Sequence, residues 1–599
     1  MKSSKTSLRT SFPNLALNRR HMLALTSSAA LAPLAGCGGS SDPNKAFEKI
    51  GATWLKESAR TSPAFATYLG DHDFDDRLND VTATGRAARA RVRADARAAL
   101  AGIDRTQLSR DNQVDAVMLT DRLDAGDFED DKLQSWAWDP LIYSDLAGGS
   151  LYGLMARDFA PLPERLLSAA ARMEGLPDLL AQTREALDAR RVPAIHARTY
   201  SSQNAGAVAI IDGLILNQAE ALSGADKSRL ADAAETAKAA IADHQDWIDS
   251  FLVPEATGDF RLGASLYDQK LRFSIDAPTP RADLAKQAKA GVEAIHEEMY
   301  AIARDVIGGA SPGALRDQKL ATIRQALDIA ASSRPPREGL VEATRAALEE
   351  TTDWTRQADL ISLPDAPVQV IVMPEFQQGS AVAYCDSPGP LDRKLDTFYA
   401  VSPVPKDWTD EQAASFLGEY NTYMLYEMAV HEAMPGHYVQ LWHANKHPNL
   451  LRAVLGSGTF IEGWACYAED MMIEQGFGAD EPMRRLTNLK MRLRSTTNAL
   501  LDQGVHVDGW SEAQAMAFMT GDAFQEEREA AGKWTRARVS SGQLSTYFVG
   551  MTQHHAVRRE IESGEGDSFN LKAYHDRVLS FGSPPVRLAR AMMLDEAVA

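Results

Sequence analysis

Cysteine and membrane-length apolar runs are both scarce in this chain. Its 599 residues include three cysteines, Cys37, Cys385 and Cys466. Three cysteines exclude a framework of several disulfides and leave room for one bridge at most. The most marked apolar run, Met22–Leu34, is shorter than the roughly 20 residues that span a bilayer. The rest of the chain is therefore expected to be soluble.

Basic residues are in deficit relative to acidic ones. The chain has 63 Lys and Arg against 82 Asp and Glu, a formal net charge of −19. The first 36 residues carry five basic residues and no acidic one, so the remainder has 58 basic against 82 acidic residues, a net charge of −24. Nucleic-acid binding needs concentrated Lys and Arg to neutralise phosphates. The charge argues against nucleic acid as a partner.

The N-terminus has the pattern of an export signal. Arg19 and Arg20 precede the apolar run, which ends in a box typical of bacterial lipoproteins, Leu34-Ala35-Gly36-Cys37. We predict a twin-arginine signal peptide over residues 1–36, a lipid-modified Cys37 and a flexible lipidated tether over 37–44. The mature protein would then lie on the periplasmic side of the cell envelope, anchored to a membrane by its lipid. A plain cleaved secretory signal with an incidental cysteine is the alternative.

Helical spacing dominates the remaining sequence. The clearest predicted helices are 162–187, 227–252, 281–307 and 411–428. Short β-prone runs predict strands at 368–373, 381–384 and 397–401. The pair Pro335-Pro336 indicates a boundary between a helical N-terminal part, 45–340, and a second part, 341–599, that contains the strands. The predicted fold class is mainly α with a small β-sheet.

A short motif in the second part predicts a metal site. It contains His431, Glu432 and, six positions after the first histidine, His437. On a regular helix that spacing turns the two imidazoles about 120° apart. Pro435 has no backbone N–H and clashes with the carbonyl of the preceding turn, and Gly436 tolerates unusual dihedrals. We expect a broken helix turn here that brings both imidazoles to one ion.

A second motif supplies the acidic side chains. Glu462 follows His437 by 25 residues, which is enough for a loop and a return helix, and Glu469 lies seven positions later on the same helix face. We predict Zn²⁺ as the cofactor, with His431, His437 and Glu462 as ligands and Glu469 supporting a ligand imidazole. Glu432 is then the base that takes a proton from water. The alternative is a surface helix with ordinary His and Glu side chains.

The predicted strands precede this motif closely in sequence. We therefore expect a small sheet beside the metal helices, whose edge can accept an extended peptide as an added strand.

These motifs resemble the bacterial lipoprotein family catalogued as domain-of-unknown-function family eight-eight-five, which is placed in the clan of zinc peptidases. The matching segments are His431-Glu432-x-x-Pro435-Gly436-His437-x-x-Gln440, Glu462-Gly463-Trp464-Ala465-x-Tyr467-Ala468-Glu469, Asp502-x-Gly504-Val505-His506, Gly542-Gln543-x-Ser545-x-Tyr547, Ser583-Pro584-Pro585, Trp138-Asp139-Pro140-Leu141 and Arg157-Asp158-Phe159. The resemblance implies a large, helical, two-lobed body with a cleft, similar to gluzincin-like metallopeptidases.

The resemblance also implies roles for three further residues. In such enzymes a tyrosine often helps to stabilise the oxyanion, which makes Tyr547 the candidate; a tyrosine packed on a helix face is the alternative. Asp502 and His506 would support the metal ligands from behind or contact substrate, and a purely structural histidine is the alternative for His506.

The predicted function is that of a zinc-dependent peptidase, either oligopeptidase-like or carboxypeptidase-like, acting on a peptide or small amide. Arg492 and Arg494 are candidates for binding a substrate carboxylate. Hydrolysis of another amide or ester at the same metal is one alternative, and a non-catalytic binding lipoprotein is another. Glu432 argues against the last, because a binding module has no use for that base.

Overall fold

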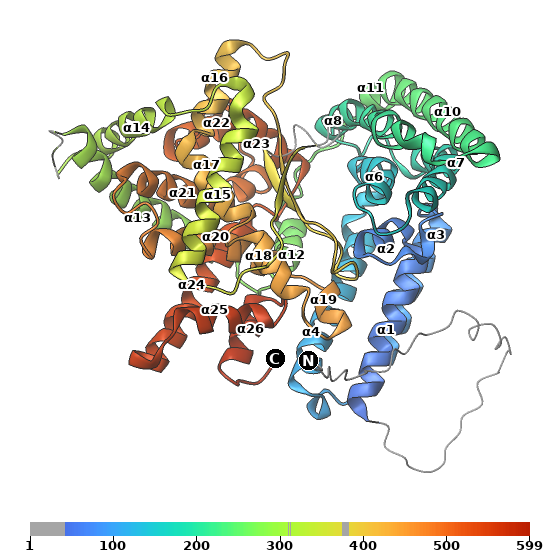
Figure 1. Ribbon diagram of the computed structural model, residues 1–599, viewed down its shortest axis with the longest axis horizontal. Coiled ribbons are helices and arrows are strands. Elements are labelled where there is room, and N and C mark those ends of the chain that lie inside the picture. The colour runs from blue at the N-terminus through green and yellow to red at the C-terminus, as the bar shows by residue number, and fades with distance from the viewer. Residues whose placement is uncertain (1–41, 309–310, 312, 374–381, 599) are drawn as a thin grey trace, which may run out of the picture. The chain divides into compact units, whose positions relative to one another are not determined.

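The computed structural model describes residues 42–308, 311, 313–373 and 382–598, and it is 73% helical with one small sheet (Figure 1). The predicted fold class, mainly α with a small β-sheet, is confirmed. The predicted signal peptide and the lipidation site Cys37 lie outside the described residues. No helix in the described part has both the length and the apolar character needed to cross a membrane.

The helices that begin before residue 340 occupy most of that part of the chain. They are α1 (Pro43–Thr61), α2 (Pro63–Leu69), α3 (Ala83–Leu100), α4 (Arg110–Phe128), α5 (Leu141–Ser144), α6 (Ser150–Met155), α7 (Leu162–Ala186), α8 (Ala194–Asn204), α9 (Gly206–Ile210), α10 (Gly224–Trp247), α11 (Val253–Glu255), α12 (Gly263–Ser274), α13 (Arg281–Ile307) and α14 (Arg316–Ser332). Because α1 begins at Pro43, the last two residues of the predicted tether are helical.

The remaining helices include those that carry the two predicted metal-site motifs. They are α15 (Leu340–Ala358), α16 (Asp410–Glu419), α17 (Thr422–Glu432), α18 (His437–Ala444), α19 (Leu450–Val454), α20 (Gly458–Glu474), α21 (Pro482–His506), α22 (Glu512–Ala517), α23 (Glu527–Val539), α24 (Ser545–Glu565), α25 (Leu571–Ser580) and α26 (Val586–Met593). The predicted boundary near residue 340 stays a prediction. Hydrophobic packing crosses it, since Val292 and Ile295 of α13 share a core cluster with Leu489 and Leu493 of α21.

The predicted helices at 162–187 and 281–307 match α7 and α13. The predicted helix at 227–252 begins three residues earlier, as α10, and a π-helical turn over Ile248–Leu252 continues it. The single helix predicted at 411–428 is wrong, because α16 ends at Glu419 and α17 begins at Thr422. Asn421 causes the break: its side chain accepts hydrogen bonds from the N–H groups of Tyr423 and Met424, at 3.0 and 3.2 Å, and so caps a new helix.

Three short strands form the sheet; the first and third lie within the predicted ranges, and the second lies two residues later than predicted. They are β1 (Gln369–Val372), β2 (Ala383–Asp386) and β3 (Phe398–Val401), in the order β1-β3-β2. β3 pairs in parallel with β1 and antiparallel with β2, so β2 is an edge strand among the described residues. Residue 381, where the second strand was predicted to begin, lies outside the described residues. Cys385 and Cys466 are both free, so these two cysteines form no disulfide with each other.

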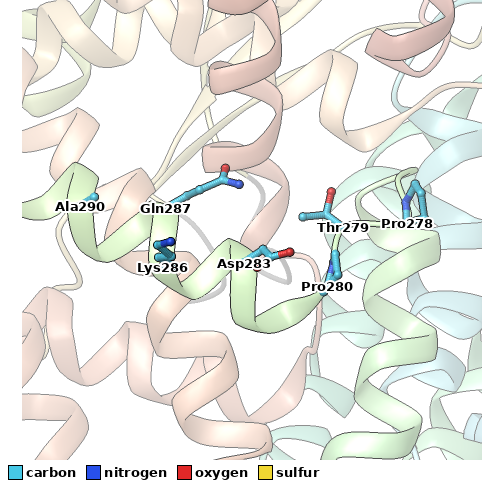
Figure 2. Close-up of a pocket in the computed structure, with 7 residues that line it drawn as sticks. All are labelled: Pro278, Thr279, Pro280, Asp283, Lys286, Gln287 and Ala290. Atoms are coloured by element: carbon cyan, nitrogen blue, oxygen red, sulfur yellow. The ribbon is translucent and has the colours of Figure 1, made fainter.

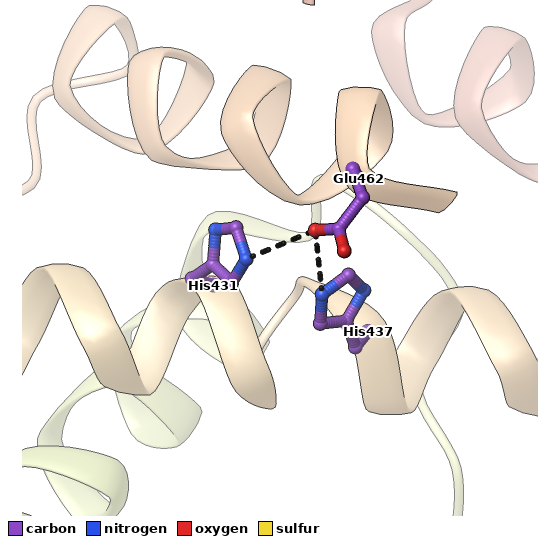
Figure 3. A group of neighbouring side chains, drawn as sticks. All are labelled: His431, His437 and Glu462. Carbon is purple, nitrogen blue, oxygen red and sulfur yellow. Dashed lines mark ion pairs between the residues drawn. The ribbon is translucent and has the colours of Figure 1, made fainter. Parts of the chain in front are cut away.

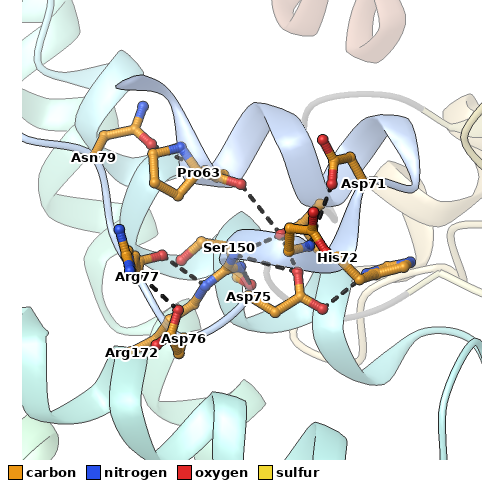
Figure 4. Close-up of polar contacts among 12 residues, drawn as sticks. Pro63, Asp71, His72, Asp75, Asp76, Arg77, Asn79, Ser150 and Arg172 are labelled. Carbon is orange, nitrogen blue, oxygen red and sulfur yellow. Dashed lines mark hydrogen bonds and ion pairs between the residues drawn. The ribbon is translucent and has the colours of Figure 1, made fainter. Parts of the chain in front are cut away.

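A buried arginine, Arg172, connects α6 and α7 to the segment that follows α2 (Figure 4). Arg172 on α7 is fully buried; its Nη1 donates to the carbonyl of Ser150 on α6 at 2.6 Å, and its Nε donates to the carbonyl of Arg77 at 3.0 Å. The carboxylate of Asp75 lies 3.7 Å away. Burial lowers the pKa of Arg172 to about 10. These partners make the buried charge tolerable and join α6 and α7 to the segment after α2.

Candidate metal centre

The chain breaks sharply between α17 and α18, at the place where the sequence predicts a broken turn. α17 ends at Glu432 and α18 begins at His437. The N–H of Gly436 donates to the carbonyl of Val430 at 2.9 Å, which folds the connection back on the end of α17. A Cβ at Gly436 would lie 1.9 Å from the carbonyl oxygen of His431. Only glycine fits this position, because no backbone atom can approach a Cβ so closely.

The break directs both imidazoles at one carboxylate (Figure 3). Nε2 of His431 lies 3.6 Å from Oε2 of Glu462, and Nε2 of His437 lies 3.4 Å from the same oxygen. The two rings are 4.7 Å apart and nearly perpendicular, at 85°. One ligand atom from each residue lies within 4.8 Å of the other two. The three predicted ligands therefore converge.

A tryptophan connects the two motifs. Trp464 on α20 is fully buried, and its Nε1 donates to the carbonyl of Pro435 at 3.0 Å. The next residue back, Gly463, lies against α24, where a Cβ would meet the backbone of Gly550 at 2.3 Å. α20 is thus held against both the helix break and α24, and this fixes where Glu462 projects.

Glu469 lies behind His431, as predicted. Its Oε1 is 2.6 Å from Nδ1 of His431, and its side chain is 2% exposed. A hydrogen bond at Nδ1 fixes the orientation of the ring and leaves Nε2 directed at Glu462. Burial lowers the pKa of His431, but the neighbouring Cys466, Glu462 and Glu469 outweigh it and raise that pKa well above its usual value. The surroundings of this imidazole therefore favour positive charge.

The donor set fits a zinc ion. Zinc ligands sit about 2.1 Å from the metal, so two of them at a tetrahedral angle are roughly 3.4 Å apart. The two nitrogen-to-oxygen distances, 3.6 and 3.4 Å, are close to that spacing and long for hydrogen bonds. Oε2 of Glu462 is buried and accepts no hydrogen bond from the described residues. Burial raises the pKa of Glu462, yet His431 and His437 hold it well below its usual range, so this carboxyl group is ionised.

Glu432 lies beside this group, and the sheet positions it. Its Oε2 accepts a hydrogen bond from the backbone N–H of Cys385 on β2 at 2.9 Å. The expected small sheet beside the metal helices is therefore present. Burial raises the pKa of Glu432, the imidazoles of His431 and His437 lower it, and Glu462 raises it further; the net shift is upward. A carboxylate with a raised pKa is a better proton acceptor than an ordinary one.

Tyr547, at the start of α24, lies close to His431. The two rings are 6.4 Å apart and nearly parallel. The phenolic oxygen accepts hydrogen bonds from Nη2 of Arg536 at 3.1 Å and from Nε2 of Gln543 at 3.2 Å. Burial and the nearby Glu462 raise the pKa of Tyr547, so its proton stays on. Because the phenolic oxygen already accepts two hydrogen bonds, its own O–H is free to donate one.

These groups line one cavity of about 840 Å³. The cavity wall includes His431, His437, Glu462, Glu432 and Tyr547, together with residues of β2 and α23. A smaller hollow of about 440 Å³ lies at the start of α13, lined by residues such as Asp283 and Lys286 (Figure 2). No imidazole or cysteine is among the residues that line it, so it offers no comparable chemistry.

Asp502 and His506 are placed differently from the sequence-based expectation. Asp502 accepts hydrogen bonds from Tyr267 and Ser545, at 2.9 and 3.4 Å. Nε2 of His506 lies 2.8 Å from the carbonyl oxygen of Ala537, near the end of α23. Neither belongs to the described residues that line the cavity. Both form hydrogen bonds with the segments around the α23–α24 connection, and these bonds do not lead to the predicted metal ligands.

Arg536 is the functional candidate that the sequence motifs did not indicate. It lies seven positions before Gln543, on a helix with no motif of its own. Its donation to Tyr547 depends on a tertiary contact between α23 and α24. The one local signal is the spacing of basic residues along α23, which a solvent-exposed helix would also show.

Comparison with known proteins identifies the family. The sequence model of the family DUF885, described as a bacterial protein of unknown function, matches residues 63–593. The chain belongs to the DUF885 family. No curated protein matches this DUF885 chain.

Two solved structures share the DUF885 chain's fold. One is a candidate lipoprotein of unknown function from Shewanella oneidensis, 32% identical, with a TM-score of 0.76. The other is a candidate lipoprotein from Colwellia psychrerythraea, 17% identical, with a TM-score of 0.75. Each similarity covers 92% of this chain and 99% of the other. The Colwellia psychrerythraea structure, at 17% identity, shows a similarity of fold only.

Proposed function

We propose that this DUF885 protein is a zinc-dependent peptidase of the zinc metallopeptidase clan. One observation carries the proposal: two imidazole nitrogens and a buried carboxylate oxygen converge at the spacing of zinc ligands, next to a carboxylate with a raised pKa. A peptide or other small amide is the substrate, and the 840 Å³ cavity is large enough for a short peptide.

Each residue has one task in this proposal. His431, His437 and Glu462 hold the ion, and Glu469 keeps the His431 ring in place. When bound, zinc acts as a Lewis acid toward water and the scissile carbonyl. The hydrogen bond from Cys385 holds Glu432 in position. Glu432 accepts the proton of the attacking water and then delivers it to the leaving amine.

Tyr547 and the sheet complete the site. The Tyr547 hydroxyl donates to the carbonyl oxygen as negative charge develops there, with Arg536 and Gln543 fixing the phenol. β2 is an edge strand that lines the cavity, so an extended substrate has backbone groups to pair with.

The test combines metal analysis with activity. Purified protein is expected to contain about one zinc per chain and to hydrolyse members of a mixed peptide library, with activity lost on chelation and restored by Zn²⁺. Glu432→Gln is expected to keep the zinc and lose about 10²–10⁴-fold in kcat. A Glu432→Gln variant that hydrolyses as fast as wild type would refute the mechanism. Mass spectrometry of the products separates peptide hydrolysis from hydrolysis of another amide or ester.

We also propose that the protein is anchored in the cell envelope by a lipid on Cys37, after export by the twin-arginine route. The box before Cys37 and the lipoprotein description of the 32% identical Shewanella oneidensis relative support this. Incorporation of labelled palmitate into wild type, and its loss in Cys37→Ser, is the expected result. Unlabelled wild-type protein would contradict it.

A further inference from the structure

Three cationic side chains on α23 line the cavity without an acidic partner. They are Arg528, Lys533 and Arg536. No carboxylate among the described residues comes within 4.0 Å of their charged nitrogens, although most other arginines of the protein form such ion pairs. Unpaired positive charge concentrated in a cavity of a chain with a net charge of −19 calls for an explanation.

The other charges on this wall are already neutralised. Arg494 donates to Oε1 of Glu529 at 2.5 Å, and Oε2 of Glu529 accepts from the hydroxyl of Tyr420 at 2.7 Å. Glu529 is therefore occupied by partners of its own. Arg494, a sequence-based candidate for carboxylate binding, is also engaged, which leaves the three α23 side chains as the available cations.

Lys533 is the clearest of the three. It is 5% exposed, and its Nζ donates to the amide oxygen of Asn498 at 3.1 Å. Burial and the nearby Arg494 lower its pKa well below the usual value, although the carboxylates of Glu529 and Glu419 act in the opposite direction. Burial beside a neutral partner disfavours the charged form of this amine, and an anion bound next to it would favour that charged form and pair with it.

The spacing of these cations relative to the metal site limits the ligand. Arg536 donates to Tyr547, whose ring lies beside His431, and Arg528 is eight positions earlier, about 12 Å along a helix axis. Gly532 lies between them, where an added Cβ would meet open space. An extended peptide advances about 3.5 Å per residue, so the cationic stretch spans about three residues.

We propose, building on the zinc-peptidase function above, that α23 binds the terminal carboxylate of a short peptide. One of Arg528, Lys533 and Arg536 receives the α-carboxylate, depending on how many residues follow the scissile bond, and cleavage removes one to three residues from the carboxyl end. Guanidinium groups bind carboxylates with two parallel hydrogen bonds, which selects a free acid over an amide. The enzyme then acts as a carboxypeptidase on short peptides and leaves internal bonds of long chains intact.

The direct test compares three substrates that differ in one charged group. The first is a short acetylated peptide with a free carboxyl end, the second is its carboxamide, and the third is a carboxamide with an internal glutamate. We expect wild type to cleave the free acid with a kcat/KM about tenfold or more above both amides. Equal rates on free acid and plain amide overturn the proposal. So does selective cleavage of the glutamate-containing amide, which would mean that the cations bind side-chain carboxylates.

Matched variants on α23 locate the effect. Arg528 lies over Trp408 at 4.3 Å and lines the cavity, whereas Arg538 lies over Trp534 at 4.7 Å and does not line it. Arg528→Met and Lys533→Met are expected to raise KM for the free acid about tenfold while leaving kinetics on the amides unchanged. Arg538→Met is expected to leave both unchanged. Variants that slow both substrates equally, with unchanged thermal stability, would contradict a role in carboxylate binding.

A binding measurement separates this proposal from the hydrolytic function. Glu432→Gln, loaded with Zn²⁺, is titrated with the free-acid peptide and its amide, and thermal shift is recorded. Stabilisation by the free-acid peptide but not by its amide supports the carboxylate site, even if no peptide is hydrolysed. This stabilisation is expected to be lost when Lys533→Met or Arg528→Met is added to Glu432→Gln. Equal stabilisation by acid and amide refutes it even if hydrolysis is confirmed.

Discussion

Nδ1 of His431 and Oε1 of Glu469 lie 2.6 Å apart, and both side chains are buried. This contact joins the end of α17 to the middle of α20, so the same helix that presents Glu462 also orients the histidine opposite it. The ring has no freedom to turn its Nε2 elsewhere.

Glu469→Gln is therefore expected to weaken zinc binding. Loss of the negative charge makes the imidazole a poorer ligand, and partners of this kind are worth about 10–100-fold in metal affinity. Competition with a fluorescent chelator measures the change. Glu474→Gln is the control, because Glu474 lies on the same helix but pairs with Arg558. Equal zinc affinities for Glu469→Gln and the control would show that the contact does not tune the metal.

Gly436→Ala is expected to destabilise the protein and abolish zinc binding together. The new methyl would meet backbone oxygens of His431 and Val430 at 1.9 and 2.3 Å, so the break between α17 and α18 must open. We expect a loss of about 3 kcal/mol or more in the free energy of unfolding, measured by denaturant titration. Gly564→Ala on α24, where a Cβ meets open space, should be neutral or raise stability by up to about 1 kcal/mol. A Gly436→Ala protein as stable as wild type would contradict this account of the break.

Local patterns indicated which residues could converge, whereas the packing of Trp464 and Gly463 that places Glu462 is tertiary. Pro435 and Gly436 stand between the histidines, and Glu462 and Glu469 follow one helix face, so short-range geometry indicates where a metal can bind. The position of Glu432 is different. Its hydrogen bond comes from Cys385, 47 residues earlier, and no periodic pattern in the sequence marks that pairing.

Two other features were missed for the same physical reason. The break at Asn421 depends on one side chain capping a helix inside a run with continuous helical spacing. The cationic side of α23 becomes meaningful only when α24 and Tyr547 lie against it. Asp502 and His506 were expected near the metal because they share a motif, yet their hydrogen bonds lead to other segments.

Acid is expected to destabilise the protein through His244, which is buried and uncharged. Its Nδ1 accepts from Nε of Arg184 at 3.1 Å, its Nε2 lies 2.8 Å from the hydroxyl of Tyr200, and burial lowers its pKa to about 4. The unfolded chain has a histidine pKa near 6.5 and binds the proton first. Its contribution to stability is thus complete above pH 6.5 and is lost as pH falls toward 4.

The measurement is the unfolding free energy between pH 4.5 and 6. We expect wild type to lose up to about 1.4 kcal/mol per pH unit through this one group. His244→Gln removes the titration and should have a correspondingly shallower slope, whatever its absolute stability. Parallel pH profiles for the two proteins would show that the ring already carries its proton in the folded state.

Gly532 provides a test of the cavity that leaves every charge in place. It lies inside α23 and lines the cavity, and an added Cβ meets no atom within 4 Å. Gly532→Ala should keep full activity and raise stability by up to about 1 kcal/mol, because alanine is the better helix former. Gly532→Trp projects a large ring between Arg528 and Arg536, and we expect kcat/KM to fall about tenfold or more with little change in Tm. Unimpaired turnover by Gly532→Trp would mean that substrate does not pass along this face of α23.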